Sequence, residues 1–443
     1  MTREKLKLVY VIATILLMVS LSGCGKKNND TSKEPEAEVT QEDSSSEAKD
    51  SEDESQISDD EATASDTTRE KEAEETAIPT QEEAPTVASL TEEEINSIHL
   101  KDIYEEYGIT LGTCLTNQMI ANKADTDIIT AQFNSVTMEN LMKPDYIFNQ
   151  KKSQDAGDLV VEFNDDTKAL LQWAKDNGMK MRGHTLVWYS QTPSWIFYDN
   201  FTTSGKYVDR DTMLKRMDSY IHQVFKLIDE LGYTDLFYAY DVVNEGLMED
   251  GNLRTENNPW YQIIGDDYIW YAFYYANQYA PESISLFYND YNEQYKMQAI
   301  IDLVNSLKTE DGTSLIDGIG LQAHLYMQDS LPDYLNAVKA FCSLGIQIQV
   351  TELDLGLGSW KKADVKTDET LRQQGQRYYE LLKGILDLKQ ETGADINSIT
   401  FWGFTDRLSW RSGNYPLLYD GDLKEKYSFF AAAQMKDYAG YEE

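Results

Sequence analysis

Basic residues are scarce in this chain of 443 residues. It has 39 Lys and Arg residues against 77 Asp and Glu residues, which gives a formal net charge of −38 at pH 7. Nucleic acids and anionic membranes attract proteins through Lys and Arg side chains. The charge balance therefore argues against a nucleic-acid partner and against an anionic lipid surface as an electrostatic partner.

Cysteine and histidine are also rare. Beyond Cys24, the chain has only Cys114 and Cys342, so the sequence holds no disulfide framework. We expect two buried free thiols, and a single disulfide between them is the alternative. The four His residues form no HExxH motif and no His/Cys cluster. This pattern predicts an activity without a catalytic metal and without a cofactor.

Aromatic side chains are missing from the whole stretch between Cys24 and Tyr104. From about Asn28 to Ser89 the chain consists mostly of Glu, Asp, Ser, Thr and Ala. Such a composition buries too little apolar surface to offset the entropy of ordering the chain. We therefore predict a disordered acidic linker over residues 24–97, and an acidic binding tail is the alternative.

Long apolar runs are limited to the first residues. Basic residues at positions 3, 5 and 7 precede a mostly apolar run from Leu8 to Val19. This run is short for a membrane-spanning helix and is typical of a signal peptide. The sequence Leu21-Ser22-Gly23-Cys24 then resembles a bacterial lipobox. The resemblance implies a signal peptide over residues 1–23, a lipid on Cys24 and a membrane anchor on the extracellular face. An ordinary secretory signal is the alternative.

Short apolar runs alternate with helical patterns after residue 98. Eight runs qualify as strands: Ile109–Gly112, Ser135–Thr137, Lys180–Leu186, Ala239–Val243, Ser285–Tyr288, Gly318–Leu321, Gln347–Thr351 and Ser398–Trp402. Strands that alternate with helices pair in parallel through crossovers. We therefore predict that residues 98–443 form one α/β domain, a single (β/α)8 barrel of the TIM type, and we expect a monomer.

Polar and aromatic residues gather where these strands end. In such a barrel the loops at the strand carboxyl ends carry the chemistry. The residues concerned are Glu139, Asn140, Lys143, His184, Trp188, Gln191, Asn244, Glu245, Asn289, Asp290, Tyr291, Asn292, Gln322, His324, Glu352, Asp354, Trp402, Asp406 and Trp410.

Two of these residues are glutamates that follow β-branched runs, in Tyr-Asp-Val-Val-Asn-Glu245 and Val-Thr-Glu352-Leu-Asp. Glycoside cleavage needs one carboxyl group that donates a proton and one carboxylate near the anomeric carbon. Glu245 and Glu352 can supply both, and His324 can hydrogen-bond Glu352 and fix its ionisation. A single glutamate at such a position is often a solvated loop acid, but the pair favours catalysis.

The tryptophans allow two interpretations. Trp188, Trp402 and Trp410 lie among polar strand-end residues, and aromatic rings there can stack on the apolar face of a sugar. The alternative is that they fill the core. Trp173, Trp260 and Trp270 lie on helical or connecting stretches, where we expect packing residues.

Six blocks of the chain follow one another in order: Phe133–Lys143, Arg182–Trp188, Asp241–Glu245, Gly318–His324, Val350–Asp354 and Trp402–Asp406. Together they resemble the successive blocks of family-10 glycoside hydrolases, which are retaining endo-β-1,4-xylanases with a (β/α)8 barrel. The resemblance implies that Glu245 is the acid/base and Glu352 the nucleophile. It also implies that xylan and xylo-oligosaccharides are the substrates.

The resemblance also distributes the binding residues. Those implied to bind the non-reducing-side xylose units are Glu139, Asn140 and Lys143. Those implied to surround the cleaved sugar are His184, Trp188, Asn244, Gln322, His324, Trp402 and Trp410. Tyr291 matches an aromatic contact on the leaving-group side, and Gln191 follows Trp188 in the same loop.

The chain departs from the family pattern at two positions, and its loop from Asp406 to Asp420 is short. Tyr189 stands where a His is common, and Tyr240 replaces the usual Trp before Asp241. Two other functions stay open: a related retaining β-glucanase, and a non-catalytic sugar-capturing lipoprotein. The first differs in its preferred polysaccharide, and the second needs no pair of carboxylates.

Overall fold

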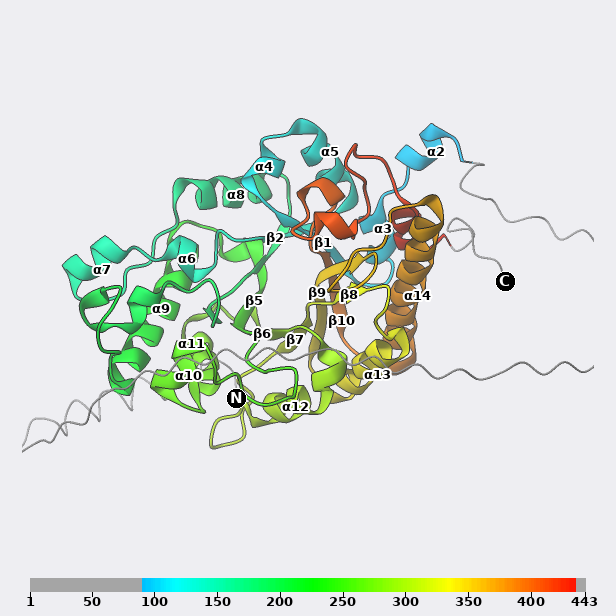
Figure 1. The fold of residues 1–443 in the computed structure, drawn as a ribbon. Helices are drawn as coiled ribbons and strands as arrows, with labels where there is room; N and C mark the ends of the chain where they lie inside the picture. Colours follow the sequence, from blue (N-terminus) through cyan, green and yellow to red (C-terminus); the bar gives the residue numbers. More distant parts are fainter. Residues whose placement is uncertain (1–89, 436–443) are drawn as a thin grey trace, which may run out of the picture. The chain divides into compact units, whose positions relative to one another are not determined.

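The computed structural model of the protein describes residues 90–435 (Figure 1). The predicted signal peptide, Cys24 and the predicted linker as far as residue 89 lie outside the described residues, as do residues 436–443. The end of the predicted linker is helical, which corrects that part of the prediction. Thr91 and Glu94 form a capping box that starts helix α2 (Glu92–Asn96), satisfying backbone N–H groups at its first turn.

A closed parallel barrel forms the centre of the described chain, as predicted. Its eight strands are β1 (Thr110–Leu115), β2 (Ser135–Met138), β3 (Lys180–Gly183), β5 (Phe237–Asn244), β6 (Ser285–Asp290), β7 (Gly318–Leu321), β9 (Gln347–Gly356) and β10 (Ile396–Phe401). The order β10-β1-β2-β3-β5-β6-β7-β9 closes because β9 also pairs with β10, and every pairing in the barrel is parallel.

Helices surround this barrel (Figure 1). The remaining α-helices are α3 (Leu100–Glu105), α4 (Asn117–Ile120), α5 (Lys123–Gln132), α6 (Pro144–Ile147), α7 (Gln150–Ala156), α8 (Asp165–Asp176), α9 (Arg210–Glu230), α10 (Pro259–Ile264), α11 (Tyr268–Tyr279), α12 (Glu293–Ser306), α13 (Leu331–Phe341), α14 (Asp368–Thr392) and α15 (Tyr427–Ala432). Six short 3₁₀ helices are η2 (Ser194–Phe197), η3 (Asp199–Phe201), η4 (Thr234–Leu236), η5 (Cys342–Leu344), η6 (Asp406–Leu408) and η7 (Ser412–Asn414).

Helix α9 shows how the sequence sets these elements. The Asp209 side chain caps its first turn by accepting a hydrogen bond from the Thr212 N–H, at 2.8 Å. Apolar residues at helical spacing, among them Met217, Ile221 and Val224, are fully buried against the barrel. The chain then leaves the helix through Gly232, whose φ of +73° suits a glycine.

The barrel interior contains buried ions as well as apolar residues. Arg182 on β3 donates two hydrogen bonds to Asp241 on β5, at 2.9 and 2.6 Å, and both side chains are fully buried. Arg182 also donates to Gln349 on β9. Loss of either ion would leave the other charge buried and unpaired, at a cost of about 3–5 kcal/mol. The same Asp241 also contacts His184, which follows β3. The buried ion pair therefore helps to position a residue at the carboxyl end of the barrel.

Every barrel strand except β7 differs from its predicted range at one end or at both. Strand β3 ends at Gly183 and not at Leu186, and β9 continues past Thr351 to Gly356. Two short strands were not predicted, β4 (Val187–Trp188), which pairs with β5, and β8 (His324–Tyr326), which pairs with β9. The pairing with β8 extends β9, so that Glu352 and Asp354 lie within a strand.

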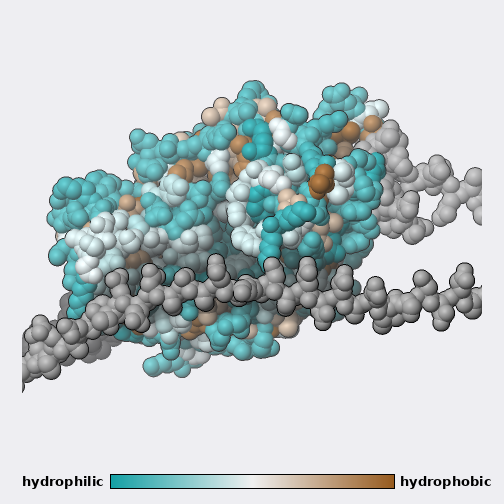
Figure 2. All heavy atoms as spheres, in the orientation of Figure 1, coloured by the Kyte–Doolittle hydropathy of each residue, from teal (hydrophilic) through white to brown (hydrophobic). Residues whose placement is uncertain are grey.

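Both cysteines of the described chain are free, so the alternative of a disulfide between them is wrong. Cys114 is buried on β1 as predicted. Cys342 is only half-buried because it begins the short η5 turn after α13. Within residues 90–435, no helix is both long and apolar enough to cross a membrane. Hydrophilic residues cover most of the face in Figure 2, with apolar residues scattered among them.

Candidate active site

A cavity of about 760 Å³ opens at the carboxyl ends of the barrel strands. All fourteen catalytic and substrate-binding residues predicted from the sequence line it: Glu139, Asn140, Lys143, His184, Trp188, Gln191, Asn244, Glu245, Tyr291, Gln322, His324, Glu352, Trp402 and Trp410. They come from the ends of seven barrel strands, so the fold brings distant segments of the chain to one place.

Glu245 directly follows strand β5. Its backbone turns out of the strand with a φ of +56°, and its N–H donates to the Asn289 carbonyl oxygen at 2.9 Å. Gln322 donates to its carboxylate at 3.1 Å. Burial raises the pKa of Glu245, and the negative charges of Asp290 and Glu352 add to this effect, against the Gln322 hydrogen bond. Glu245 is therefore suited to hold a proton.

Glu352 lies on β9 and is 5% exposed. Its carboxylate accepts a hydrogen bond from Asn289 at 2.7 Å and contacts His324 Nε2 at 3.2 Å, as predicted. Burial alone would raise its pKa, but the His184 and His324 imidazoles and the Lys143 ammonium outweigh burial and lower the pKa of Glu352 to about 2. This carboxylate is therefore ionised at neutral pH.

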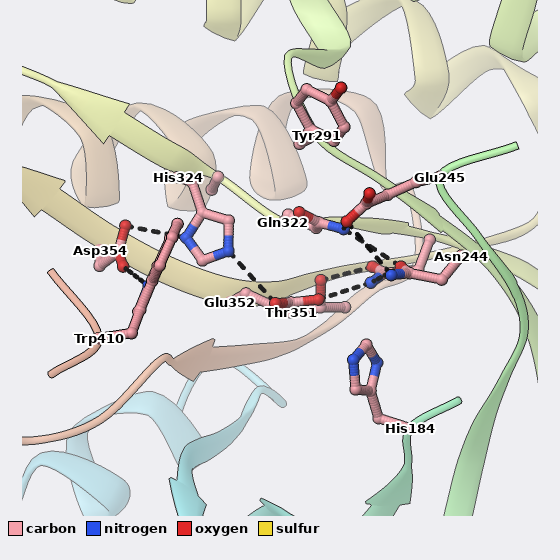
Figure 3. A network of polar contacts seen from close by, with 12 residues as sticks. His184, Asn244, Glu245, Tyr291, Gln322, His324, Thr351, Glu352, Asp354 and Trp410 are labelled. Atoms are coloured by element: carbon pink, nitrogen blue, oxygen red, sulfur yellow. Dashed lines mark hydrogen bonds and ion pairs between the residues drawn. The ribbon is translucent and has the colours of Figure 1, made fainter. Parts of the chain in front are cut away.

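One hydrogen-bond network joins the two glutamates (Figure 3). The Asn244 Oδ1 atom accepts from Asn289 at 2.9 Å and from Gln322 at 3.1 Å. Asn289 donates its second N–H to Glu352, and Gln322 donates to Glu245. The carboxylates are thus held by neighbouring amides in one rigid arrangement, although one lies on β9 and the other after β5.

Asp354 organises the other side of His324. His324 Nδ1 lies 2.9 Å from Asp354, and Trp410 donates its indole N–H to the second oxygen of the same carboxylate, also at 2.9 Å. Arg411 completes the group with a salt bridge to Asp354. Burial opposes a charge on His324, but Asp354 and Glu352 together raise the pKa of His324 to about 10. A protonated His324 thus donates to both carboxylates.

A second polar group lies on the β2 and β3 loops. The Lys143 ammonium donates to Gln191 at 2.8 Å and to Asn140 at 3.1 Å, and it lies 5.0 Å from the centre of the Trp188 ring. Gln191 also donates to Asn140, at 3.2 Å. Glu139 faces the same cavity. This group offers several donors and acceptors to hydroxyl groups.

The cavity separates the tryptophans into two sets, since Trp188, Trp402 and Trp410 line it and the other three discussed above do not. Trp410 is 53% exposed in the cavity wall, whereas Trp402 is 6% exposed and presents only part of its ring. Both rings contact His324, with centres 5.1 and 6.5 Å away. Trp260 is completely buried and donates to the Trp188 carbonyl oxygen. Trp173 and Trp270 pack against the apolar core.

Two acids that follow strands have structural contacts and do not line the cavity. Asp290 forms a buried salt bridge with Lys296 at 2.5 Å. Asp406 forms another with Lys426 at 2.9 Å and accepts from the Leu417 N–H. Their positions at strand ends gave no sign of this difference.

Eight further residues line the cavity: Tyr189, Glu249, Asn292, Tyr295, Tyr326, Asp329, Trp360 and Arg411. Of these, only Asn292 was among the strand-end residues named from the sequence. Tyr189 was noted only as a departure from the family pattern. Its ring lies 4.2 Å from the Arg254 guanidinium, which also donates to the Glu245 carbonyl oxygen at 3.0 Å and to the Tyr291 hydroxyl at 3.1 Å. Six of these eight residues lie in loops, where position gives no periodic signal, whereas Tyr295 lies on α12 and Tyr326 on β8.

The chemistry of this arrangement follows from the two opposed pKa shifts. One carboxyl group is suited to donate a proton and the other stays ionised, which is the division that glycoside hydrolysis requires. Among residues 90–435, no group of three or more His, Cys, Asp or Glu side chains could hold a metal ion.

Comparison with known proteins agrees with this geometry. The sequence model of the protein family "Glycosyl hydrolase family 10" matches residues 99–435. Endo-1,4-beta-xylanase B of Butyrivibrio fibrisolvens is 36% identical over 346 residues, which cover 75% of this chain and 52% of that protein. Exoglucanase XynX of Acetivibrio thermocellus is 34% identical, over 75% of this chain and 29% of that protein. The chain thus spans about half, or less, of the length of these relatives.

Solved structures extend the similarity to the fold. The CBM22-1 and GH10 modules of a Clostridium thermocellum endo-1,4-beta-D-xylanase, complexed with xylohexaose, match with a TM-score of 0.69 and 32% identity. The match covers 76% of this chain and 67% of that structure.

Proposed function

Because the chain belongs to glycosyl hydrolase family 10, we propose that it hydrolyses internal β-1,4 bonds of xylan with retention of configuration. The observation that carries this proposal is the pair of carboxyl groups with opposed pKa shifts, joined by one hydrogen-bond network. Retaining enzymes hold their two carboxyl groups only about 5 Å apart, within reach of such a network.

The reaction has two steps. Glu245 protonates the glycosidic oxygen while the Glu352 carboxylate attacks the anomeric carbon, so the leaving chain departs as an alcohol and a glycosyl-enzyme ester forms. Glu245, now ionised, then takes a proton from a water molecule, which attacks the anomeric carbon and releases Glu352. Both substitutions invert the anomeric centre, and the product keeps the β configuration.

Other residues that line the cavity bind the sugar units of the substrate. We propose that Glu139, Asn140 and Lys143 bind the non-reducing-side xylose units, together with Gln191. His184, Trp188, Asn244, Gln322, His324, Trp402 and Trp410 surround the cleaved sugar, and Tyr291 contacts the leaving-group side. In this scheme, the amide of Asn244 lies beside Glu245 and binds the sugar 2-hydroxyl, a contact that strengthens in the transition state.

Alanine variants of the two glutamates test the mechanism with an aryl xylobioside that has an activated phenol as leaving group. Glu352→Ala should not turn it over, because no covalent route remains. Glu245→Ala should still form the glycosyl-enzyme, since an activated phenol needs little protonation, but hydrolysis should slow by about 10²–10⁴-fold. Azide should speed this variant and give the β-glycosyl azide.

The exposed Glu310→Ala change is the matched control and should leave both rates unchanged. If azide restores activity to Glu352→Ala while Glu245→Ala stays inactive, the two glutamates have the opposite roles. An α-configured product from the wild-type enzyme would rule out double displacement.

A β-glucanase is the second candidate, because one relative carries the name exoglucanase. Initial rates on xylan and on carboxymethylcellulose separate the two substrates. We expect xylan to be preferred, and a preference for the cellulose derivative would favour the second candidate.

We also propose that the protein is a bacterial lipoprotein, held on the extracellular face of a membrane through Cys24, and that it acts as a monomer. The basic residues before Leu8, the apolar run to Val19 and the lipobox-like Leu21–Cys24 support the anchor. The acidic, aromatic-free stretch that follows would serve as a tether.

A further inference from the structure

Trp360 is the most exposed aromatic side chain that lines the catalytic cavity. It is 76% exposed and belongs to the loop between β9 and α14. Isolated exposed apolar residues are common on protein surfaces and need no function. Trp360 differs because its large ring lies on the wall of a cavity that also holds both glutamates.

A tight turn holds Trp360 in this position. The Ser359 N–H donates to the Lys362 carbonyl oxygen at 2.8 Å, and the Lys362 N–H donates back to Ser359 at 3.2 Å. Gly358 begins the turn with a φ of +81°, where a Cβ atom would lie 2.3 Å from the Lys362 oxygen. The turn therefore requires glycine and places Trp360 at its tip.

The base of the turn is also fixed. The Leu357 N–H donates to the Asn414 carbonyl oxygen, and the Asn414 side-chain amide donates to the Leu357 carbonyl oxygen, each at 2.8 Å. These bonds tie the turn to the loop that carries Trp410. The turn is tied to the protein at Leu357 and closed by the bonds between Ser359 and Lys362, so a sugar that stacks on Trp360 would have less loop entropy to overcome.

The strand order tells which end of the cavity Trp360 occupies. In the ring β10-β1-β2-β3-β5-β6-β7-β9, strand β7 lies across the barrel from β2, and β9 lies across from β3. The β2 and β3 loops carry the group around Lys143. The loops after β7 and β9 carry Tyr326, Asp329 and Trp360, which therefore lie at the opposite end.

We propose that Trp360 is a sugar-stacking residue on the leaving-group side, where it binds a xylose unit beyond the one at Tyr291. This rests on the proposed function, in which the Lys143 group binds the non-reducing side. An indole face matches the apolar C–H face of a xylose ring, and xylose lacks the hydroxymethyl group that would crowd such contact. Trp360 then sets the chain length at which the enzyme becomes efficient.

The test compares two substrates in the full chain. Xylohexaose is long enough to reach Trp360, whereas 4-nitrophenyl β-xylobioside carries only a phenol on the leaving-group side. For Trp360→Ala we expect kcat/KM on xylohexaose to fall about five- to tenfold, and kcat/KM on the aryl xylobioside to stay within about twofold of wild type. With reducing-end-labelled xylohexaose, the main cleavage position should move toward the reducing end.

Val365→Ala is the matched control, since Val365 is 77% exposed on the same loop but does not line the cavity. It should change neither substrate nor the cleavage position, and Trp360→Tyr should restore most of the loss on xylohexaose. Unchanged kinetics and cleavage pattern in Trp360→Ala would overturn the inference, as would an equal loss on both substrates. Failure of the wild-type enzyme to cleave either substrate would overturn the proposed function itself.

Discussion

The ionisation of Glu352 depends on cations that other strands supply. His324 reaches it from β8 and is kept protonated by Asp354 and Glu352, so the imidazolium donates one N–H to each of the two carboxylates. Lys143 adds positive charge from the β2 loop. The proposed nucleophile therefore stays ionised despite its burial, and this should be visible in the pH dependence of activity.

Removal of the His324 charge should raise the pKa of Glu352. In the free enzyme, kcat/KM requires an ionised Glu352 and a protonated Glu245. The acid limb therefore reports the pKa of Glu352, at about 2, and the alkaline limb reports the raised pKa of Glu245. His324→Gln should shift the acid limb upward by about one unit or more, while the alkaline limb should move much less.

The measurement is kcat/KM against pH with a soluble aryl xylobioside. His222→Gln is the matched control, because His222 is exposed on α9 and stacks on Tyr279 away from the cavity. An acid limb that stays in place in His324→Gln would show that His324 does not set the ionisation of Glu352.

At the scale of single residues, the sequence predicted the cavity residues that follow strand runs and missed most of those that lie elsewhere in the loops. Glu245, Glu352 and the predicted binding residues could be placed at the cavity because each follows a strand run, and most of them also belong to a family-like block. Asp329 and Trp360 could not, because a loop residue carries no periodic signal. Asp290 and Asp406 show that an acid near a strand end need not belong to the site. Each forms a buried salt bridge with a lysine, Lys296 and Lys426 respectively.

Among the secondary-structure elements, strand β7 contributes to the site through a glycine, Gly320, which leaves space for a neighbouring side chain. Gly320 faces Asn289 on the neighbouring strand β6, and a Cβ atom at position 320 would lie 2.4 Å from the Asn289 Oδ1 atom. Asn289 in turn donates to Glu352 and Asn244. The glycine thus makes room for the amide that joins the two catalytic segments.

Gly320→Ala should therefore reduce both stability and activity. The added methyl group must displace Asn289 or the backbone, which costs about 1–3 kcal/mol in the free energy of unfolding. A displaced Asn289 would also weaken its bond to Glu352, so we expect kcat on xylan to fall. Urea unfolding and initial rates measure the two effects.

Gly413→Ala is the matched control, because nothing lies within 4 Å of a Cβ atom at that position. It should leave both the free energy of unfolding and kcat close to their wild-type values. A Gly320→Ala variant as stable and as active as this control would show that the strands adjust without moving Asn289.

The eight barrel strands were predictable because buried parallel strands are short apolar runs between helical patterns. Strands β4 and β8 were not, since two or three residues are too few to show a pattern. The pairing of β8 with β9 depends on tertiary contact and carries Glu352 and Asp354 deeper into a strand than the sequence indicated. The capping box at Thr91 and Glu94 was a readable signal for helix α2 that the acidic composition obscured.

At the scale of the whole molecule, the catalytic machinery and the proposed anchor occupy separate parts of the chain. Every residue of the candidate site lies between Glu139 and Arg411, and the family match covers residues 99–435. Cys24 lies more than one hundred residues before Glu139. The proposed lipid anchor should therefore determine where the enzyme acts and not how fast it cleaves a soluble substrate.

Replacement of Cys24 tests this separation in cells. Cys24→Ser removes the thiol that a lipid would modify, so the protein should leave the membrane fraction or keep an uncleaved signal peptide. Its kcat/KM on xylohexaose should equal that of the wild type, since no site residue is touched.

Cys342→Ser is the matched control, because it makes the same change at a free cysteine of the barrel domain and should keep the protein with the membranes. A processed Cys24→Ser protein that still fractionates with membranes would contradict the lipid anchor, and a loss of activity on the soluble substrate would contradict the independence of the catalytic unit.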